Sequence, residues 1–205
     1  MPSKIYTKKG DRGCTFIGDG TKVSKAALQP EVCGRIDELN VALGAVKIML
    51  PENSAKKKSV EAVQTNLFQI AGTAARALPS NNPSLIEKLM SETSFFESDI
   101  DQIEERIGSL DHFIYPGDNE LSIRWHLARV ACRRIERALV QLMQEQEIEP
   151  AITAYLNRLS DWLFTQAREA GMKQINEGVE TRFIASQNGD GFIQCIKKKL
   201  KTLAN

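Results

Sequence analysis

Residues 121–142 read LSIRWHLARVACRRIERALVQL, and this stretch decides the fold class. Its apolar residues recur at alternating spacings of four and three, which places them on one face of a helix. They are Leu121, Trp125, Ala128, Cys132, Ile135, Leu139 and Leu142. An apolar face of this kind is typical of a helix that packs against a shared core.

The same periodicity occurs in segments on both sides of this stretch. It predicts further helices over residues 32–50, 60–78, 84–107 and 150–170. Pro51 would end the first of these, Ser84 with Glu87 has the spacing of a capping box at the start of the third, and Pro150 suits the first position of the last. No strand-like alternation of comparable length occurs. The pattern predicts an all-α five-helix bundle with antiparallel neighbours.

We expect one domain over residues 1–205, because this length can bury a sizeable core. It would comprise a glycine-rich basic segment (1–30), a helical bundle (31–177) and a C-terminal appendage (178–205). The formal net charge of +1 argues against nucleic acid or a membrane surface as partner. The N-terminus shows no apolar signal core, and no run of about 18 apolar residues occurs, so we expect a cytoplasmic protein.

Metal and disulfide chemistry have little support. The four cysteines, Cys14, Cys33, Cys132 and Cys195, are far apart in the sequence, and His112 and His126 are the only histidines. This spacing suits neither a structural zinc site nor a disulfide framework.

The N-terminal segment carries the first functional signal. Residues 7–15 read TKKGDRGCT, and the first 25 residues hold five Lys and one Arg against two Asp. Glycines let backbone N–H groups approach an anion, while Lys, Arg and Thr side chains bind phosphate oxygens. The spacing matches neither a Walker A loop nor a dinucleotide fingerprint. Composition alone leaves two readings open, a phosphate-binding segment and a flexible basic arm.

Polar residues beside the apolar faces form rows of their own along three of the predicted helices. A helical turn of 3.6 residues aligns each row, and together the rows could line a polar site. They are Asp37, Asn40, Gly44 and Lys47 on the first helix, His126, Arg129, Arg133 and Glu136 on the fourth, and Asn157, Asp161 and Arg168 on the fifth. The arginines of the fourth helix could equally form a solvated face, and His126 is better explained as a packed or surface residue than as a ligand.

Five motifs in this order resemble the PduO-type ATP:cob(I)alamin adenosyltransferases. The resemblance runs from about Lys4 to about Arg168. The motifs are Thr-Lys-x-Gly-Asp-x-Gly-x-Thr at 7–15 with Lys25 downstream, IDELN at 36–40, FIYPG at 113–117, ARVACRRIER at 128–137 and YLNRLSD at 155–161. Asp118 departs from the family pattern, in which glycine frequently follows Pro-Gly.

The resemblance implies a bundle of the ferritin-like or cobalamin adenosyltransferase type. It also implies an enzyme that transfers the 5′-deoxyadenosyl group of ATP to cob(I)alamin and releases triphosphate, with Mg²⁺ as cofactor. Such enzymes are typically homotrimers with active sites between subunits, and a reductase and a cobalamin-dependent enzyme are possible partners. Two other functions stay open, a non-enzymatic cobalamin carrier and a helical ATP-sensing regulator.

Site residues carry over by matching position. The resemblance implies that Asp37 pairs with Arg129 across a subunit boundary and that Phe113 presses on the lower face of the corrin, excluding the axial ligand. Phe113 could otherwise be an ordinary core aromatic. The implied ATP-binding residues are Thr7, Lys8, Lys9, Gly10, Gly13, Thr15, Lys25, Arg133, Arg134, Glu136, Arg137 and Asn157.

Overall fold

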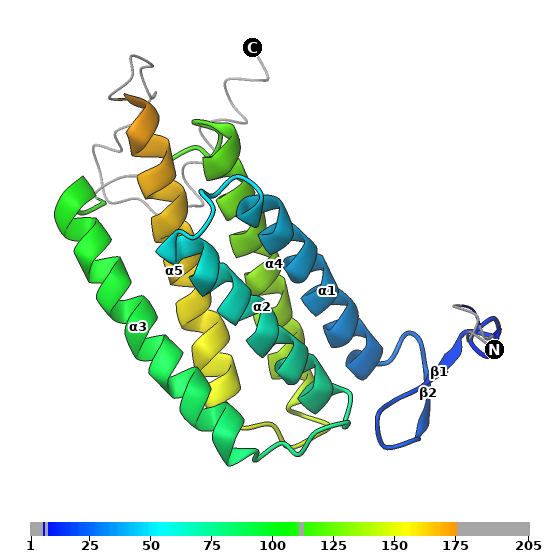
Figure 1. The fold of residues 1–205 in the computed structure, drawn as a ribbon. Helices are drawn as coiled ribbons and strands as arrows, with labels where there is room; N and C mark the ends of the chain where they lie inside the picture. The colour runs from blue at the N-terminus through cyan, green and yellow to red at the C-terminus, as the bar shows by residue number, and fades with distance from the viewer. Residues whose placement is uncertain (1–5, 7, 111–112, 176–205) are drawn as a thin grey trace, which may run out of the picture.

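The computed structural model describes residue 6, residues 8–110 and residues 113–175 of the 205-residue chain. Five helices form a bundle, which confirms the predicted all-α fold (Figure 1). Their bounds are α1 Leu28–Lys47, α2 Ala55–Ala74, α3 Pro83–Ile107, α4 Glu120–Leu142 and α5 Pro150–Ile175. Neighbours are antiparallel where α4 packs against α1 and α5, but α3 and α5 run in the same direction, so the predicted antiparallel arrangement is wrong for that pair. The proposed C-terminal appendage begins beyond α5, outside the described residues.

Helix α4 lies between α5 and α1 in the bundle, α5 also packs against α3, and α1 packs against α2. The predicted apolar face of α4 is the centre of the core, with Trp125, Ala128, Cys132 and Ile135 all buried. Trp125 meets Trp162 of α5 edge-on at 5.6 Å between ring centroids, and Trp162 stacks on Phe96 of α3 at 5.1 Å. These rings join three helices into one core.

Helix α3 begins differently from the prediction. The capping box at Ser84 is wrong, because Pro83 is already the first helical residue and the side chain of Asn82 accepts the N–H of Leu85 at 3.4 Å. Proline favours this first position, since its φ is already helical and it has no N–H to leave unpaired. Asn82 is therefore the N-cap.

The N-terminal segment contains a small hairpin that the sequence did not predict. Strand β1 (Cys14–Phe16) pairs antiparallel with β2 (Lys22–Ser24), and Thr15 lies opposite Val23. Strands of three residues are too short to show an alternating pattern. The hairpin stands beside the end of the bundle at which α1 begins (Figure 1).

Candidate functional site

The seam between α4 and α5 brings together two residues of the predicted fourth-helix row. The guanidinium of Arg129 lies 5.7 Å from the centre of the Phe164 ring, and the His126 ring lies 5.9 Å from it. His126 and Arg129 lie on α4, each next in sequence to a residue of its apolar face, and Phe164 lies on α5. Cation–π contact and ring packing hold this group together.

Polar atoms of this group lack partners within the part of the chain that is described. They are Nε of Arg129 and both ring nitrogens of His126, and all three atoms are buried. His126 is 3% exposed, so of the two expected positions, packed or surface, it has the packed one, and burial together with the nearby Arg129 lowers its pKa to about 4. His126 is therefore neutral near pH 7. Buried polar groups are nearly always hydrogen-bonded, so these atoms mark where a ligand or another chain can supply partners.

Residues from the fourth-helix and fifth-helix rows meet further along the same seam. Arg133, Glu136 and Asp161 all act electrostatically on the buried thiol of Cys132, whose pKa is raised chiefly by burial. The thiol also donates to the carbonyl of Leu156 on α5 at 3.2 Å. The structure thus brings Asp161 of the α5 row close to Arg133 and Glu136 of the α4 row. Arg168 does not join them, because it is buried and pairs with Glu104 of α3 at 2.9 Å.

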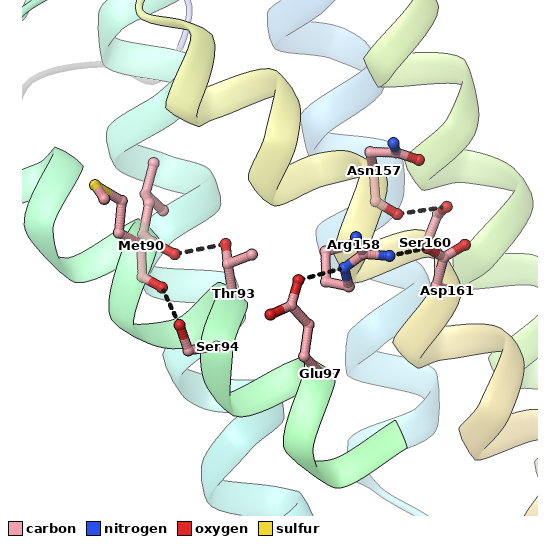
Figure 2. A network of polar contacts seen from close by, with 9 residues as sticks. Met90, Thr93, Ser94, Glu97, Asn157, Arg158, Ser160 and Asp161 are labelled. Carbon is pink, nitrogen blue, oxygen red and sulfur yellow. Dashed lines mark hydrogen bonds and ion pairs between the residues drawn. The ribbon is translucent and has the colours of Figure 1, made fainter. Parts of the chain in front are cut away.

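Asn157 and Asp161 are held in place through their neighbours on α5. Arg158 donates to Asp161 at 2.7 Å and to Glu97 of α3 at 3.0 Å, and the hydroxyl of Ser160 donates to the carbonyl of Asn157 (Figure 2). The amide of Asn157 points away from the Arg158–Glu97 pair in this view. This amide is exposed and available to a ligand.

Arg134 and Arg137 differ from Arg133 in their surroundings. Arg134 forms an ion pair with Glu38 of α1 at 3.1 Å, and its backbone carbonyl accepts from Arg35 of α1 at 2.9 Å. Arg134 therefore lies toward α1 rather than in the α4–α5 seam. Arg137 is exposed, with no ion pair to another described residue.

The predicted phosphate-binding residues gather at the open end of the hairpin, where the chain enters β1 and leaves β2. The backbone N–H of Lys25 donates to the carbonyl of Gly13 at 2.9 Å, and a Cβ on Gly10 would lie 2.9 Å from Nζ of Lys25. Lys8 has a left-handed backbone with φ of 59°, and it is exposed, as is Lys9. Thr15 is half-buried in β1, and Thr7 lies outside the described residues. The hairpin thus presents cations and glycines together.

The row on α1 faces a different flank of the bundle from Arg129. Asp37 contributes to the raised pKa of the Cys33 thiol, which is caused mainly by burial, and that thiol donates to the carbonyl of Ala71 on α2. In the same row, the backbone carbonyl of Asn40 accepts from the side-chain amide of Gln64 on α2 at 3.0 Å. Asp37 is exposed toward α2, whereas Arg129 faces α5, so the described residues of one chain hold no Asp37–Arg129 ion pair.

Phe113 lies in the loop before α4 with 57% of its surface exposed, so it is not a core aromatic within the chain. The base of this loop is attached to α5. Asn119 caps α4 by accepting the N–H of Ser122 at 2.7 Å and donates to the carbonyl of Ala170 at 2.7 Å. Asp118 packs over Gly171, where a Cβ would lie 2.5 Å from Oδ2, and burial raises the pKa of Asp118.

Phe164 is the site residue that sequence reasoning missed. It follows Asn157 by seven residues, which is two helical turns on the same face of α5, so that spacing could have identified it. It belongs to neither the predicted apolar face nor the predicted polar row of this helix.

The described residues hold neither a metal-ligand cluster nor a membrane-spanning helix. No cluster of three or more His, Cys, Asp or Glu side chains there has the arrangement of a metal site. Among the same residues, no helix is both long and apolar enough to span a membrane.

Known proteins are similar to this chain over most of its length. A family model described as cobalamin adenosyltransferase matches residues 5–170. The corrinoid adenosyltransferase PduO of Salmonella typhimurium is 36% identical over 188 residues, covering 89% of this chain and 55% of that protein. The chain therefore spans about half the length of this relative. The corrinoid adenosyltransferase of Bacillus subtilis is 36% identical over 168 residues, covering 80% of this chain and 85% of that protein.

A solved structure shares the fold. It is a phenylalanine-to-alanine variant of a PduO-type ATP:corrinoid adenosyltransferase from Lactobacillus reuteri, complexed with cobalamin and ATP. The match has a TM-score of 0.75 at 29% identity and covers 90% of this chain and 100% of that chain. The match to the family model extends from the N-terminal segment into α5. The chain belongs to the cobalamin adenosyltransferase family.

Proposed function

We propose that this protein transfers the 5′-deoxyadenosyl group of ATP to cob(I)alamin. In this reaction Co(I) attacks C5′ of ATP, the Co–C bond forms as the C5′–O bond breaks, and triphosphate leaves with the bonding electrons. The family match over residues 5–170 carries the proposal, and the Lactobacillus reuteri relative was solved with both substrates. The cobalt supplies the nucleophile, so the protein's task is to orient the substrates and stabilise the leaving group.

The hairpin is our candidate for binding the triphosphate. Lys8, Lys9 and Lys25 would supply positive charge, while the backbone at Gly10 and Gly13 would supply N–H donors. Thr7 and Thr15 would add hydroxyl groups. Support comes from the contact between Lys25 and Gly10 and from the left-handed backbone at Lys8 and Gly13, which turn this segment back on itself.

The α4–α5 seam is our candidate for the remainder of ATP. Arg133, Glu136 and Asn157 are best placed there, with Arg137 exposed on the same helix. Contact of Arg134 with ATP would require a site on the α1 side of α4, because Arg134 is paired with Glu38. Phe113 would press its ring on the corrin and exclude an axial ligand, and its exposure supports this role.

We propose a homotrimer in which each active site combines surfaces of two subunits. Asp37 and Arg129 lie on different flanks of one bundle, so their predicted pairing requires a second chain. Exposed apolar side chains along the outer faces of α1 and α4 support such an interface, with Val41 75% and Leu127 59% exposed. A reductase that supplies Co(I), a cobalamin-dependent enzyme that receives the product and a cytoplasmic location stay predictions.

The residues present fit a loosely held Mg²⁺. This cation commonly keeps several waters and binds through substrate phosphates, so a dedicated carboxylate cluster is not required. When bound, it would neutralise charge on the triphosphate. The Lys side chains of the hairpin would bind the same triphosphate oxygens.

The test is an anaerobic assay with chemically reduced cobalamin, ATP and Mg²⁺. It follows the corrinoid absorbance change and the release of triphosphate. We expect adenosylcobalamin and triphosphate in equal amounts. Binding of both substrates without either product would favour the carrier, ATP binding without corrinoid binding would favour the regulator, and both results would contradict the transferase.

A further inference from the structure

The tip of the hairpin, residues 17–21 between β1 and β2, is fixed to the end of α2 by a close backbone contact. The N–H of Gly18 donates to the carbonyl of Ala75 at 2.7 Å. A Cβ on Gly18 would lie 2.4 Å from Cα and 2.5 Å from the backbone nitrogen of Ala77. Backbone atoms cannot swing aside as a flexible side chain can. Only glycine at position 18 therefore allows the tip to lie where it does.

The residue that follows this helix end has an unfavourable backbone conformation. Helix α2 ends in a Schellman motif, in which the N–H of Ala77 bonds to the carbonyl of Gly72 at 2.8 Å and that of Arg76 bonds to the carbonyl of Thr73 at 3.0 Å. Arg76 occupies the left-handed position, with φ of 56°, where glycine is the usual residue. A residue that conflicts with its local backbone indicates a role for its side chain.

The side chain of Arg76 links three segments. Its Nε donates to Oε1 of Gln146 at 3.0 Å, and Gln146 in turn donates to the carbonyls of Thr73 and Ala74 at the end of α2. Its Nη1 also lies 3.7 Å from Oδ2 of Asp19 in the hairpin tip. The Asp19 pair is solvent-exposed and contributes little. The Gly18 contact therefore holds the tip directly, and the Arg76–Gln146 bond acts one step away, because it fixes the end of α2 to which the tip is attached.

We propose that Gly18 and Arg76 are positioning residues for ATP, and this inference rests on the proposed function. The hairpin is covalently joined to α1 only through residues 25–27, and a two-stranded hairpin alone is marginally stable. The contact at the tip gives it a second attachment. Each strand has three residues, so the cations at the open end lie about 10 Å from the tip. Fixing the tip preorganises those cations before ATP arrives, which lowers the ordering cost of binding.

The test compares two variants of the full-length protein with the wild type. Gly18→Ala introduces the clash with Ala77, and Arg76→Gly removes the side chain while relieving the backbone strain. Gly34→Ala is the control, because a Cβ there would meet nothing within 4 Å. Calorimetry gives the Kd of ATP, steady-state assays give KM and kcat, and thermal unfolding reports on the bundle.

We expect both variants to raise the Kd and KM for ATP about tenfold, while kcat at saturating ATP stays within about twofold, since bound ATP orders the segment again. The Tm of Arg76→Gly should not fall. Unchanged ATP affinity in both variants, or a parallel loss of affinity, kcat and Tm, would overturn the inference. The expected shift in ATP affinity without adenosylcobalamin formation by the wild type would support the positioning role and refute only the transferase. A wild type that binds no ATP would refute both.

Discussion

At the scale of single residues, Arg129 and His126 are among the side chains with buried polar atoms that have no partner in the described part of the chain, as is Asn40 on α1. Nε of Arg129 and both nitrogens of His126 are buried without partners there, although Phe164 supports both side chains. A buried donor without a partner costs about 1–3 kcal/mol, so its persistence calls for a partner beyond the described residues. In the proposed trimer, Asp37 of the partner subunit would bind Arg129.

Phe113→Ala should separate corrinoid chemistry from ATP binding. Loss of the exposed ring would leave Co(II) free to keep an axial ligand and harder to reduce, so adenosylation that starts from Co(II) corrinoid and a one-electron reductant should fall by about tenfold or more. The Kd of ATP should change little. Calorimetry with ATP and an anaerobic assay started from Co(II) corrinoid measure the two effects, and equal losses in both would contradict the role of Phe113.

His126 should make stability depend on pH. Its pKa is about 4 in the folded chain against about 6.5 when unfolded, so the unfolded state binds more protons between these values. The free energy of unfolding should therefore fall as the pH drops from 6.5 to 4, by about 3 kcal/mol for this residue. Urea unfolding at matched protein concentration should show this loss in the wild type but not in His126→Leu. Parallel pH curves for the two proteins would show that His126 is not the cause.

At the scale of elements, the long helices could be predicted because their apolar faces repeat over many turns. Position 150 is an example, since Pro150 was expected to begin the last helix and does begin α5. Elements of a few residues could not be predicted. The hairpin strands are too short for a pattern, and the start of α3 depended on a choice between two polar residues on either side of Pro83, Asn82 and Ser84.

The cap of α3 gives a direct test at this scale. Asn82→Ala should lower the free energy of unfolding by about 1 kcal/mol, because the N–H of Leu85 loses its acceptor. Ser84→Ala, the matched control inside the first turn, should change it by less than about 0.5 kcal/mol. Chemical denaturation of both variants measures the difference. A larger loss of stability from Ser84→Ala than from Asn82→Ala would contradict Asn82 as the N-cap and favour the capping box at Ser84.

At the scale of the whole molecule, the sequence predicted which rows of polar residues exist but not which of them meet. Arg133 and Glu136 on α4 lie near Asp161 on α5. In contrast, Arg168 of the same α5 row pairs with α3, and Asp37 lies toward α2. Spacing along one helix fixes a face but not the helix that this face meets, because that depends on the packing of all five. The resemblance predicted a site between subunits, and the separation of Asp37 from Arg129 agrees with it.

The most direct measurement mixes two variants, Asp37→Ala and Arg129→Ala. Each alone should be nearly inactive if both residues serve every active site. Co-expressed in equal amounts with different tags, they should form mixed trimers in which one interface joins an intact Asp37 to an intact Arg129. Random mixing then restores about a quarter of wild-type adenosylcobalamin formation. Activity of the mixture no greater than that of the separate variants would contradict an adenosyltransferase site shared between subunits.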